Sequence, residues 1–198
     1  MNEYKVALYN LGEDTERGSQ LHSILDKLSI PSVTIEASQL NQRVGYIAGI
    51  SGYFKDSLMY MGDAPDCEFM VMCGLPEDVL DKFLEEMMAV SLRINYKAVV
   101  TEHNRDYTLI QLLEDIKREH EMYQSYLKVD KLIKQVEALD PFVYGSDREW
   151  MNTRQGLKLA KTIMSRDNLT ATQLDSVFRS LEKQYNLLLS QYISPVKK

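Results

Sequence analysis

Apolar positions in the first part of the chain form short runs that alternate with amphipathic segments. The run Lys5-Val6-Ala7-Leu8-Tyr9 is β-prone and ends at the turn signal Asn10-Leu11-Gly12. Four apolar residues then recur at helical spacing: Leu21, Ile24, Leu25 and Leu28. Pro31 ends this helix, and a second β-prone run follows it. The order predicts a strand, a helix and a strand, the composition of a βαβ unit.

The same pattern recurs 64 residues later in the chain. Residues 8–14 align without a gap with residues 72–78, and both stretches pass from an apolar run into an acidic helix start. Acidic residues there interact favourably with the helix macrodipole. A helix over 79–90 and a strand over 97–100 complete the second unit. The repeat therefore predicts two βαβ units.

The link between these units is long and contains a short helical pattern over 38–50. A long crossover favours parallel strands over a hairpin. We therefore expect an α/β fold with a small, four-stranded, mainly parallel sheet of order 2-1-3-4. A ferredoxin-like α+β sheet of order 4-1-3-2 stays open, because both orders place the apolar first and third strands at the centre. The expected strands lie near residues 5–10, 32–36, 68–73 and 97–100.

From Thr108 onward the apolar spacing is helical throughout. Thr108 and Gln111 form a capping-box pattern, and the helix that they begin continues over 108–139 until Asp140-Pro141 stops it. Two further helices are expected over 147–165 and 171–192, before a frayed tail from Ser194. The chain is thus predicted to divide into an α/β domain, residues 1–107, and a helical region, residues 108–198.

The helix over 108–139 is longer than the small sheet that it covers. Its distal apolar residues need a second surface: Tyr123, Tyr126, Leu127, Ile133 and Val136. The last two helices can supply that surface in an antiparallel bundle. Where this cover is incomplete, the same residues predict a protein partner or a homodimer through the C-terminal helices.

Composition and charge narrow the class of protein. The chain has 198 residues, of which 44% are apolar and 26% charged, as expected for a globular protein. Its longest apolar run, 69–75, is too short to cross a membrane, and its start lacks a secretory signal. Two cysteines near one apolar segment, Cys67 and Cys73, suit a reducing compartment, so we expect a cytoplasmic protein.

The charge is uneven along the chain. Residues 1–107 contain nine Lys and Arg against seventeen Asp and Glu, whereas residues 108–198 contain fourteen against twelve. An acidic front half argues against nonspecific nucleic-acid binding, which depends on clustered cations.

Ligands of a parallel sheet bind beyond the carboxyl ends of its strands. In the expected topology five residues meet there as candidates for binding an unknown small ligand: Asn10, Gly74, Thr101, His103 and Asn104. The simpler interpretation is that the asparagines satisfy turns and that Gly74 relieves a steric clash.

Signals for catalysis and cofactors are weak. Cys73 and His103 have the residue types of a nucleophile and its base, but Cys73 follows an apolar run, which indicates an inert buried thiol. His120 lies on an apolar helix stripe, apart from the face of Asp115 and Glu119, so we predict no metal site. No glycine-rich phosphate loop is present, and we predict no cofactor.

The stretch from Glu68 to His120 resembles a bacterial family known only as a domain of unknown function. The resemblance rests on a few motifs: Met70-Val71-Met72-Cys73-Gly74-Leu75, Pro76-Glu77-Asp78, Lys97-Ala98-Val99-Val100-Thr101, Asn104, Tyr107-Thr108 and the segment from Leu112 to His120. It implies a small bacterial cytoplasmic protein and no particular reaction. The sequence thus favours a noncatalytic interaction or ligand-sensing module. The alternative is a small cytoplasmic enzyme that acts through Cys73, His103 and Asn104.

Overall fold

The computed structural model describes residues 4–144 and 148–193. The chain forms two compact units that divide between Arg118 and Glu119. This division lies inside helix α4 (Leu109–Glu137), later than the boundary expected at residue 107, because the first turns of α4 belong to the core of the α/β unit. The expected helix start at 147 and the expected frayed tail lie outside the described residues.

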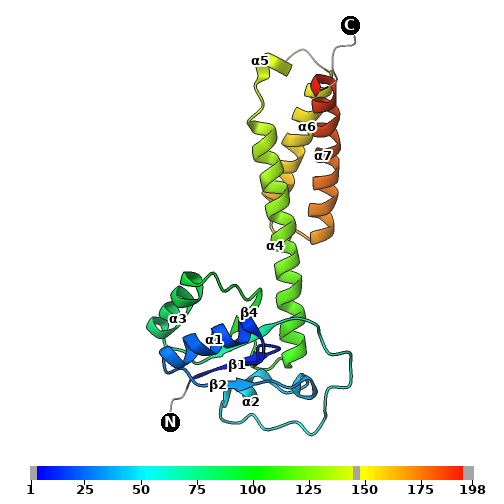
Figure 1. The fold of residues 1–198 in the computed structure, drawn as a ribbon. Helices are drawn as coiled ribbons and strands as arrows, with labels where there is room; N and C mark the ends of the chain where they lie inside the picture. The colour runs from blue at the N-terminus through cyan, green and yellow to red at the C-terminus, as the bar shows by residue number, and fades with distance from the viewer. Residues whose placement is uncertain (1–3, 145–147, 194–198) are drawn as a thin grey trace. The chain divides into compact units, whose positions relative to one another are not determined.

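A four-stranded sheet forms the centre of the α/β unit (Figure 1). Its order is β2 (Ser32–Thr34), β1 (Lys5–Tyr9), β3 (Phe69–Cys73) and β4 (Tyr96–Val99), as the 2-1-3-4 prediction requires. Every residue of β3 is buried, whereas β4 alternates between half-buried and exposed positions. A strand covered on both faces needs a continuous apolar sequence, which explains why β1 and β3 are the most apolar.

The expectation of a mainly parallel sheet is confirmed only in part. β1 pairs with β2 and β3 pairs with β4 in parallel, but β1 and β3 are antiparallel, so the sheet is mixed. The ferredoxin-like order is not found, since β2 lies beside β1 at the sheet edge. The error arose because a long connection can return the chain in either direction, and apolarity places a strand at the centre without orienting it.

Helices cover both faces of the sheet (Figure 1). On one face α1 (Glu16–Lys27) and α3 (Glu77–Ala89) bury Leu21 and Phe83 against alternate residues of β1 and β3. On the other face lie the 3-10 helix η1 (Ala37–Gln39), the short helix α2 (Val44–Ala48) and the start of α4. The α/β unit is therefore a three-layer sandwich with two apolar cores.

The two βαβ units are related by a local twofold axis through the sheet centre. Ala7 pairs with Val71, and these residues are also equivalent in the 64-residue repeat. Each central strand ends in a residue of left-handed backbone, Asn10 with φ 54° and Gly74 with φ 65°. The predicted internal repeat therefore exists in three dimensions, with its copies facing each other across the β1–β3 pair.

The repeat extends past β2 and β4 into the following helices. The Val44 amide donates to the Tyr107 carbonyl at 2.9 Å, and the Leu109 amide donates to the Gln42 carbonyl at 3.0 Å. Each donor begins the helix after its own unit, so these two hydrogen bonds are equivalents across the same axis. α2 and the start of α4 thus occupy matching places in the two repeats.

The helical unit comprises the distal part of α4 with α6 (Arg148–Met164) and α7 (Ala171–Ile193), and a short helix α5 (Pro141–Tyr144) follows α4. Ile133 and Val136 of α4 are buried against residues of α6 and α7, so the predicted bundle forms within one chain. The capping boxes at Thr108 and Thr170 are present, each closed by a glutamine three residues later. Across 4–144 and 148–193, no helix is both long and apolar enough to span a membrane.

Candidate functional site

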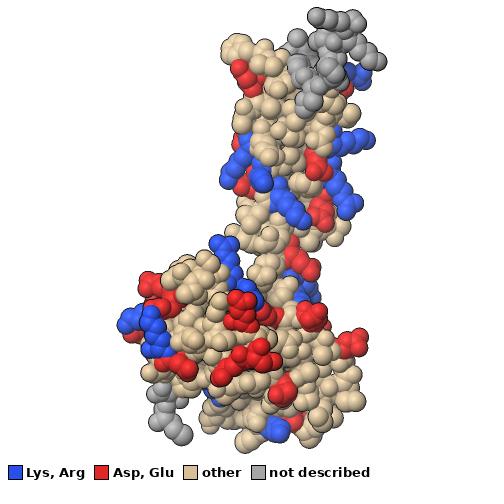
Figure 2. All heavy atoms as spheres, viewed as in Figure 1, with Lys and Arg blue, Asp and Glu red and all other residues tan. Residues whose placement is uncertain are grey.

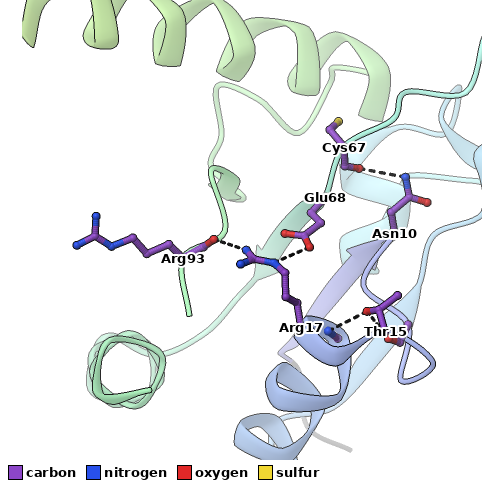
Figure 3. A network of polar contacts seen from close by, with 8 residues as sticks. Asn10, Thr15, Arg17, Cys67, Glu68 and Arg93 are labelled. Carbon is purple, nitrogen blue, oxygen red and sulfur yellow. Dashed lines mark hydrogen bonds and ion pairs between the residues drawn. The ribbon is translucent and has the colours of Figure 1, made fainter. Parts of the chain in front are cut away.

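Asn10 lies at the carboxyl end of β1, where the chain turns toward α1. Its side-chain amide donates to the Cys67 carbonyl oxygen at 3.1 Å (Figure 3). It also donates to the Pro65 carbonyl oxygen at 3.1 Å. The neighbouring Tyr9 hydroxyl donates to the same Pro65 carbonyl at 3.1 Å. These contacts fix the segment that leads into β3 beside the end of β1.

An open groove of about 580 Å³ lies at this end of the sheet, next to Asn10. Three carboxylates line it, from Asp14, Glu36 and Asp66. A second groove shares Asn10 and Asp66 and extends to Glu68. The surface beyond the ends of β1 and β2 is therefore acidic. Figure 2 shows Asp and Glu side chains gathered on one face of the same unit.

Arg17 of α1 balances part of this charge. Its Nε donates to Glu68 Oε1 at 2.7 Å, and its Nη2 donates to the Arg93 carbonyl (Figure 3). The Thr15 hydroxyl accepts from the Gly18 amide at 3.0 Å and so caps the same helix. Because Arg17 is half exposed, its ion pair contributes little stability, but it holds Glu68 toward α1 and leaves Asp14 and Asp66 to face the groove.

Three of the other candidates lie together on the loop that follows β4. The Thr101 amide donates to Asn104 Oδ1 at 2.8 Å, and Asn104 Nδ2 donates to the Val99 carbonyl at 2.9 Å. The His103 ring is exposed and lies 6.3 Å from the Tyr107 ring. The Asn104 side chain thus closes its own loop, as the simpler interpretation of this residue predicted.

The five candidates do not line one site. In the β1–β3 register Lys5 pairs with Cys73 and Tyr9 pairs with Phe69. Asn10 therefore lies beyond one end of the strands, whereas Gly74 and the loop after β4 lie beyond the opposite end. The expected common rim is wrong because it assumed that β1 and β3 are parallel.

Cys73 faces the apolar core between the sheet and the α2 layer. Only 1% of its surface is exposed, and burial raises the pKa of its thiol to about 11. A thiol of this kind is a poor nucleophile at neutral pH. Within the described part of the chain, no group of three or more His, Cys, Asp or Glu residues could hold a metal ion.

The second repeat coincides with a known family. Residues 68–123 match a domain of unknown function, DUF3783. The DUF3783 match covers β3, α3, β4 and the first half of α4, and it agrees with the resemblance of residues 68–120 to such a domain. No curated protein and no solved structure shows significant similarity to the chain. The stretch that is similar to DUF3783 therefore contributes β3 and β4, one half of the twofold sheet, and β3 pairs with β1 of the other half.

Two further surfaces have functional potential; the first was not singled out from the sequence, whereas the second contains Tyr123 and Tyr126, for which the sequence predicted an additional contact. One is the segment 51–66, which the sequence pattern predicted only as a connection. Its large apolar residues Phe54, Leu58, Met59 and Met61, close together in sequence, could have indicated a surface for binding. The other is an apolar groove of about 630 Å³ in the helical unit. Residues of α4 and of the α6–α7 connection meet there: Met122, Tyr123, Tyr126, Arg166, Asn168, Leu169 and Leu174, the last from α7.

Proposed function

We propose that this chain is a noncatalytic interaction module whose helical unit associates with a second copy of itself. The observation that carries the proposal is the apolar groove beside Tyr123 and Tyr126. Tyr123 is 58% exposed, although Ile133 and Val136 of the same helix are buried by α6 and α7. The cover within one chain is thus incomplete at Tyr123, one of the residues for which the sequence predicts association.

The groove and its neighbours suit a symmetric contact. A twofold dimer interface needs a surface that complements itself. The patch contains a groove with the buried Leu174 in its lining, and beside it the partly exposed side chains of Tyr123 and Tyr126. In a twofold dimer these tyrosines of each copy can pack into the groove of the other. Aromatic side chains are enriched at such interfaces because they bury a large area at a small cost in conformational entropy.

The α/β unit acts in this proposal as the scaffold for a second interaction, and Asn10 is the candidate residue that borders its acidic groove. We also propose that the protein acts in the bacterial cytoplasm. The resemblance of the second repeat supports the bacterial origin, and the free thiols of Cys67 and Cys73 suit a reducing compartment.

The test is the oligomeric state of the full chain measured by light scattering over a range of concentrations. We expect a dimer for the parent chain and a monomer for Tyr126→Glu, because a carboxylate in an apolar contact loses its hydration. Leu159→Glu is the matched control, since Leu159 is an exposed apolar residue of the same unit that does not line the groove. Circular dichroism checks that both variants remain helical.

A dimeric Leu159→Glu chain beside a monomeric Tyr126→Glu chain supports association through the groove. A parent chain that stays monomeric up to the highest concentration, or a Tyr126→Glu chain that dimerises like the parent, overturns this function.

A further inference from the structure

The segment 51–66 is the part of the α/β unit that breaks its twofold symmetry. After the first repeat, α2 ends at Ala48 and is capped by Gly49, which has φ 77°. The chain then enters this segment without forming a helix or strand. After the second repeat, the equivalent helix α4 continues. The segment is therefore an addition to the repeated fold.

The segment is nevertheless held firmly in place by polar contacts. Gln42 binds both polar backbone atoms of Asp56: its Nε2 donates to the carbonyl at 2.9 Å, and its Oε1 accepts from the amide at 2.8 Å. Three more contacts follow along the segment: Asn41 Nδ2 to the Met59 carbonyl at 3.1 Å, the Tyr60 amide to the Ser38 carbonyl at 2.9 Å, and Asn10 Nδ2 to the Pro65 carbonyl at 3.1 Å. Gln42 itself is buried, so its two bonds to Asp56 are partly sheltered from water.

This fixed backbone holds large apolar side chains in water. Met61 is 90% exposed, and three others are mostly exposed: Phe54, Leu58 and Met59. Exposed apolar residues gathered in one short segment mark an interaction surface. A surface whose backbone is ordered before binding loses less entropy when a partner arrives.

The charge beside these side chains defines the chemistry of the partner. The Tyr60 contact places the segment next to Ser38 of η1, and the chain then runs through Ala64–Asp66 along the acidic groove. Asp14, Glu36 and Asp66 line that groove. A partner that contacts both features must present apolar and cationic groups side by side.

We propose that Leu58, Met59 and Met61, together with the acidic groove at Asp66, form a docking surface for a basic amphipathic helix of a partner protein. Such a helix carries an apolar stripe beside lysine or arginine, and the unbranched methionine side chains adapt to its apolar face. The surface belongs to the α/β unit and is independent of the groove in the helical unit.

The probe is a synthetic peptide of leucine and lysine, about 18 residues or five helical turns long, with the leucines at helical spacing. A second peptide carries glutamate in place of every lysine. Binding to the full chain is measured by fluorescence anisotropy. We expect the lysine peptide to bind the parent chain, and we expect the double variant Met59→Ser with Met61→Ser to bind it about tenfold more weakly.

Matched control variants distinguish binding at this surface from nonspecific binding of the peptide to other parts of the protein. Met88→Ser removes a methionine that is 69% exposed on α3, the opposite layer of the sandwich, and should leave binding unchanged. Asp66→Asn should weaken binding, whereas Asp81→Asn, an exposed carboxylate on α3, should not. The proposal is overturned if the parent chain does not bind the lysine peptide, if the glutamate peptide binds as tightly, or if the Met59 and Met61 variant binds like Met88→Ser.

Discussion

At the scale of single residues, the two ends of the central strands show how equivalent positions acquired different roles. Asn10 and Gly74 both adopt left-handed backbone, which asparagine and glycine tolerate better than other residues. Gly74 meets only the backbone requirement. Asn10 meets the same requirement and also donates hydrogen bonds to two carbonyls of the segment that leads into β3, and it lines the acidic groove.

Cys73 provides a test of the buried-thiol interpretation. With a pKa of about 11, only about one Cys73 thiol in a thousand is ionised at pH 8. We expect native-state alkylation of Cys73 to be at least about a hundredfold slower than that of a free thiol in a peptide. Raising the pH toward 11 should increase the rate, because the thiolate fraction rises. Mass spectrometry of the labelled protein measures both cysteines separately.

Cys67 serves as the internal reference in that experiment because it is only half-buried. It should react before Cys73 in the folded chain, and both should react readily in denaturant. Rapid labelling of native Cys73 at pH 8 would contradict the buried position and would restore the enzyme hypothesis.

At the scale of elements, the turn between β1 and α1 depends on a close approach between two glycines. A Cβ atom added to Gly18 would lie 1.8 Å from the Gly12 carbonyl oxygen and 2.7 Å from the Thr15 hydroxyl oxygen. Backbone cannot move away as a flexible side chain can. The helix start and the turn therefore require glycine at position 18.

The substitution Gly18→Ala has two opposing effects on the free energy of unfolding, one from helix propensity and one from the clash with Gly12. Propensity alone favours alanine in a helix by about 1 kcal/mol. The clash with the Gly12 carbonyl costs about 2–3 kcal/mol, so we expect a net loss of about 1–2 kcal/mol in the free energy of unfolding. Urea denaturation measures it. Ser19→Ala at the next, exposed position should change stability by less than about 0.5 kcal/mol, and a Gly18→Ala chain as stable as Ser19→Ala would refute the argument.

At the scale of the whole molecule, the two proposed surfaces lie on different units and can be separated by truncation. A chain that ends at His120 keeps the α/β unit, including residues 51–66, and lacks the helical unit. We expect this fragment to be folded and monomeric, because the residues around Tyr123 and Tyr126 are gone. We also expect it to bind the lysine peptide like the full chain.

Light scattering and peptide titration of the fragment check the two expectations independently. A fragment that dimerises as strongly as the full chain assigns association to the α/β unit and contradicts the helical interface. A folded fragment that no longer binds the lysine peptide contradicts the docking surface at Met59 and Met61.

The sequence by itself determined the elements and their order along the chain. The apolar runs identified all four strands, the 64-residue recurrence identified the repeat, and the capping box at Thr108 identified the start of the long helix. These features depend on contacts between residues close in sequence or on burial, and both produce a recognisable spacing of apolar and capping residues along the chain. The central position of β1 and β3 could be predicted for the same reason, since only central strands are apolar on both faces.

Only the tertiary structure decided the direction of β3 and, with it, the location of the candidate site. That direction depends on the backbone pairing of β1 with β3, two strands about 64 residues apart in sequence, and backbone groups of any residue type can form such pairs. Because β3 is antiparallel to β1 and not parallel as expected, the other four candidates lie at the opposite end of the strands from Asn10: Gly74, Thr101, His103 and Asn104. The exposed state of Met61 was likewise undetermined by sequence, because an apolar residue in a connection is equally compatible with burial until the contacts of its neighbours are known.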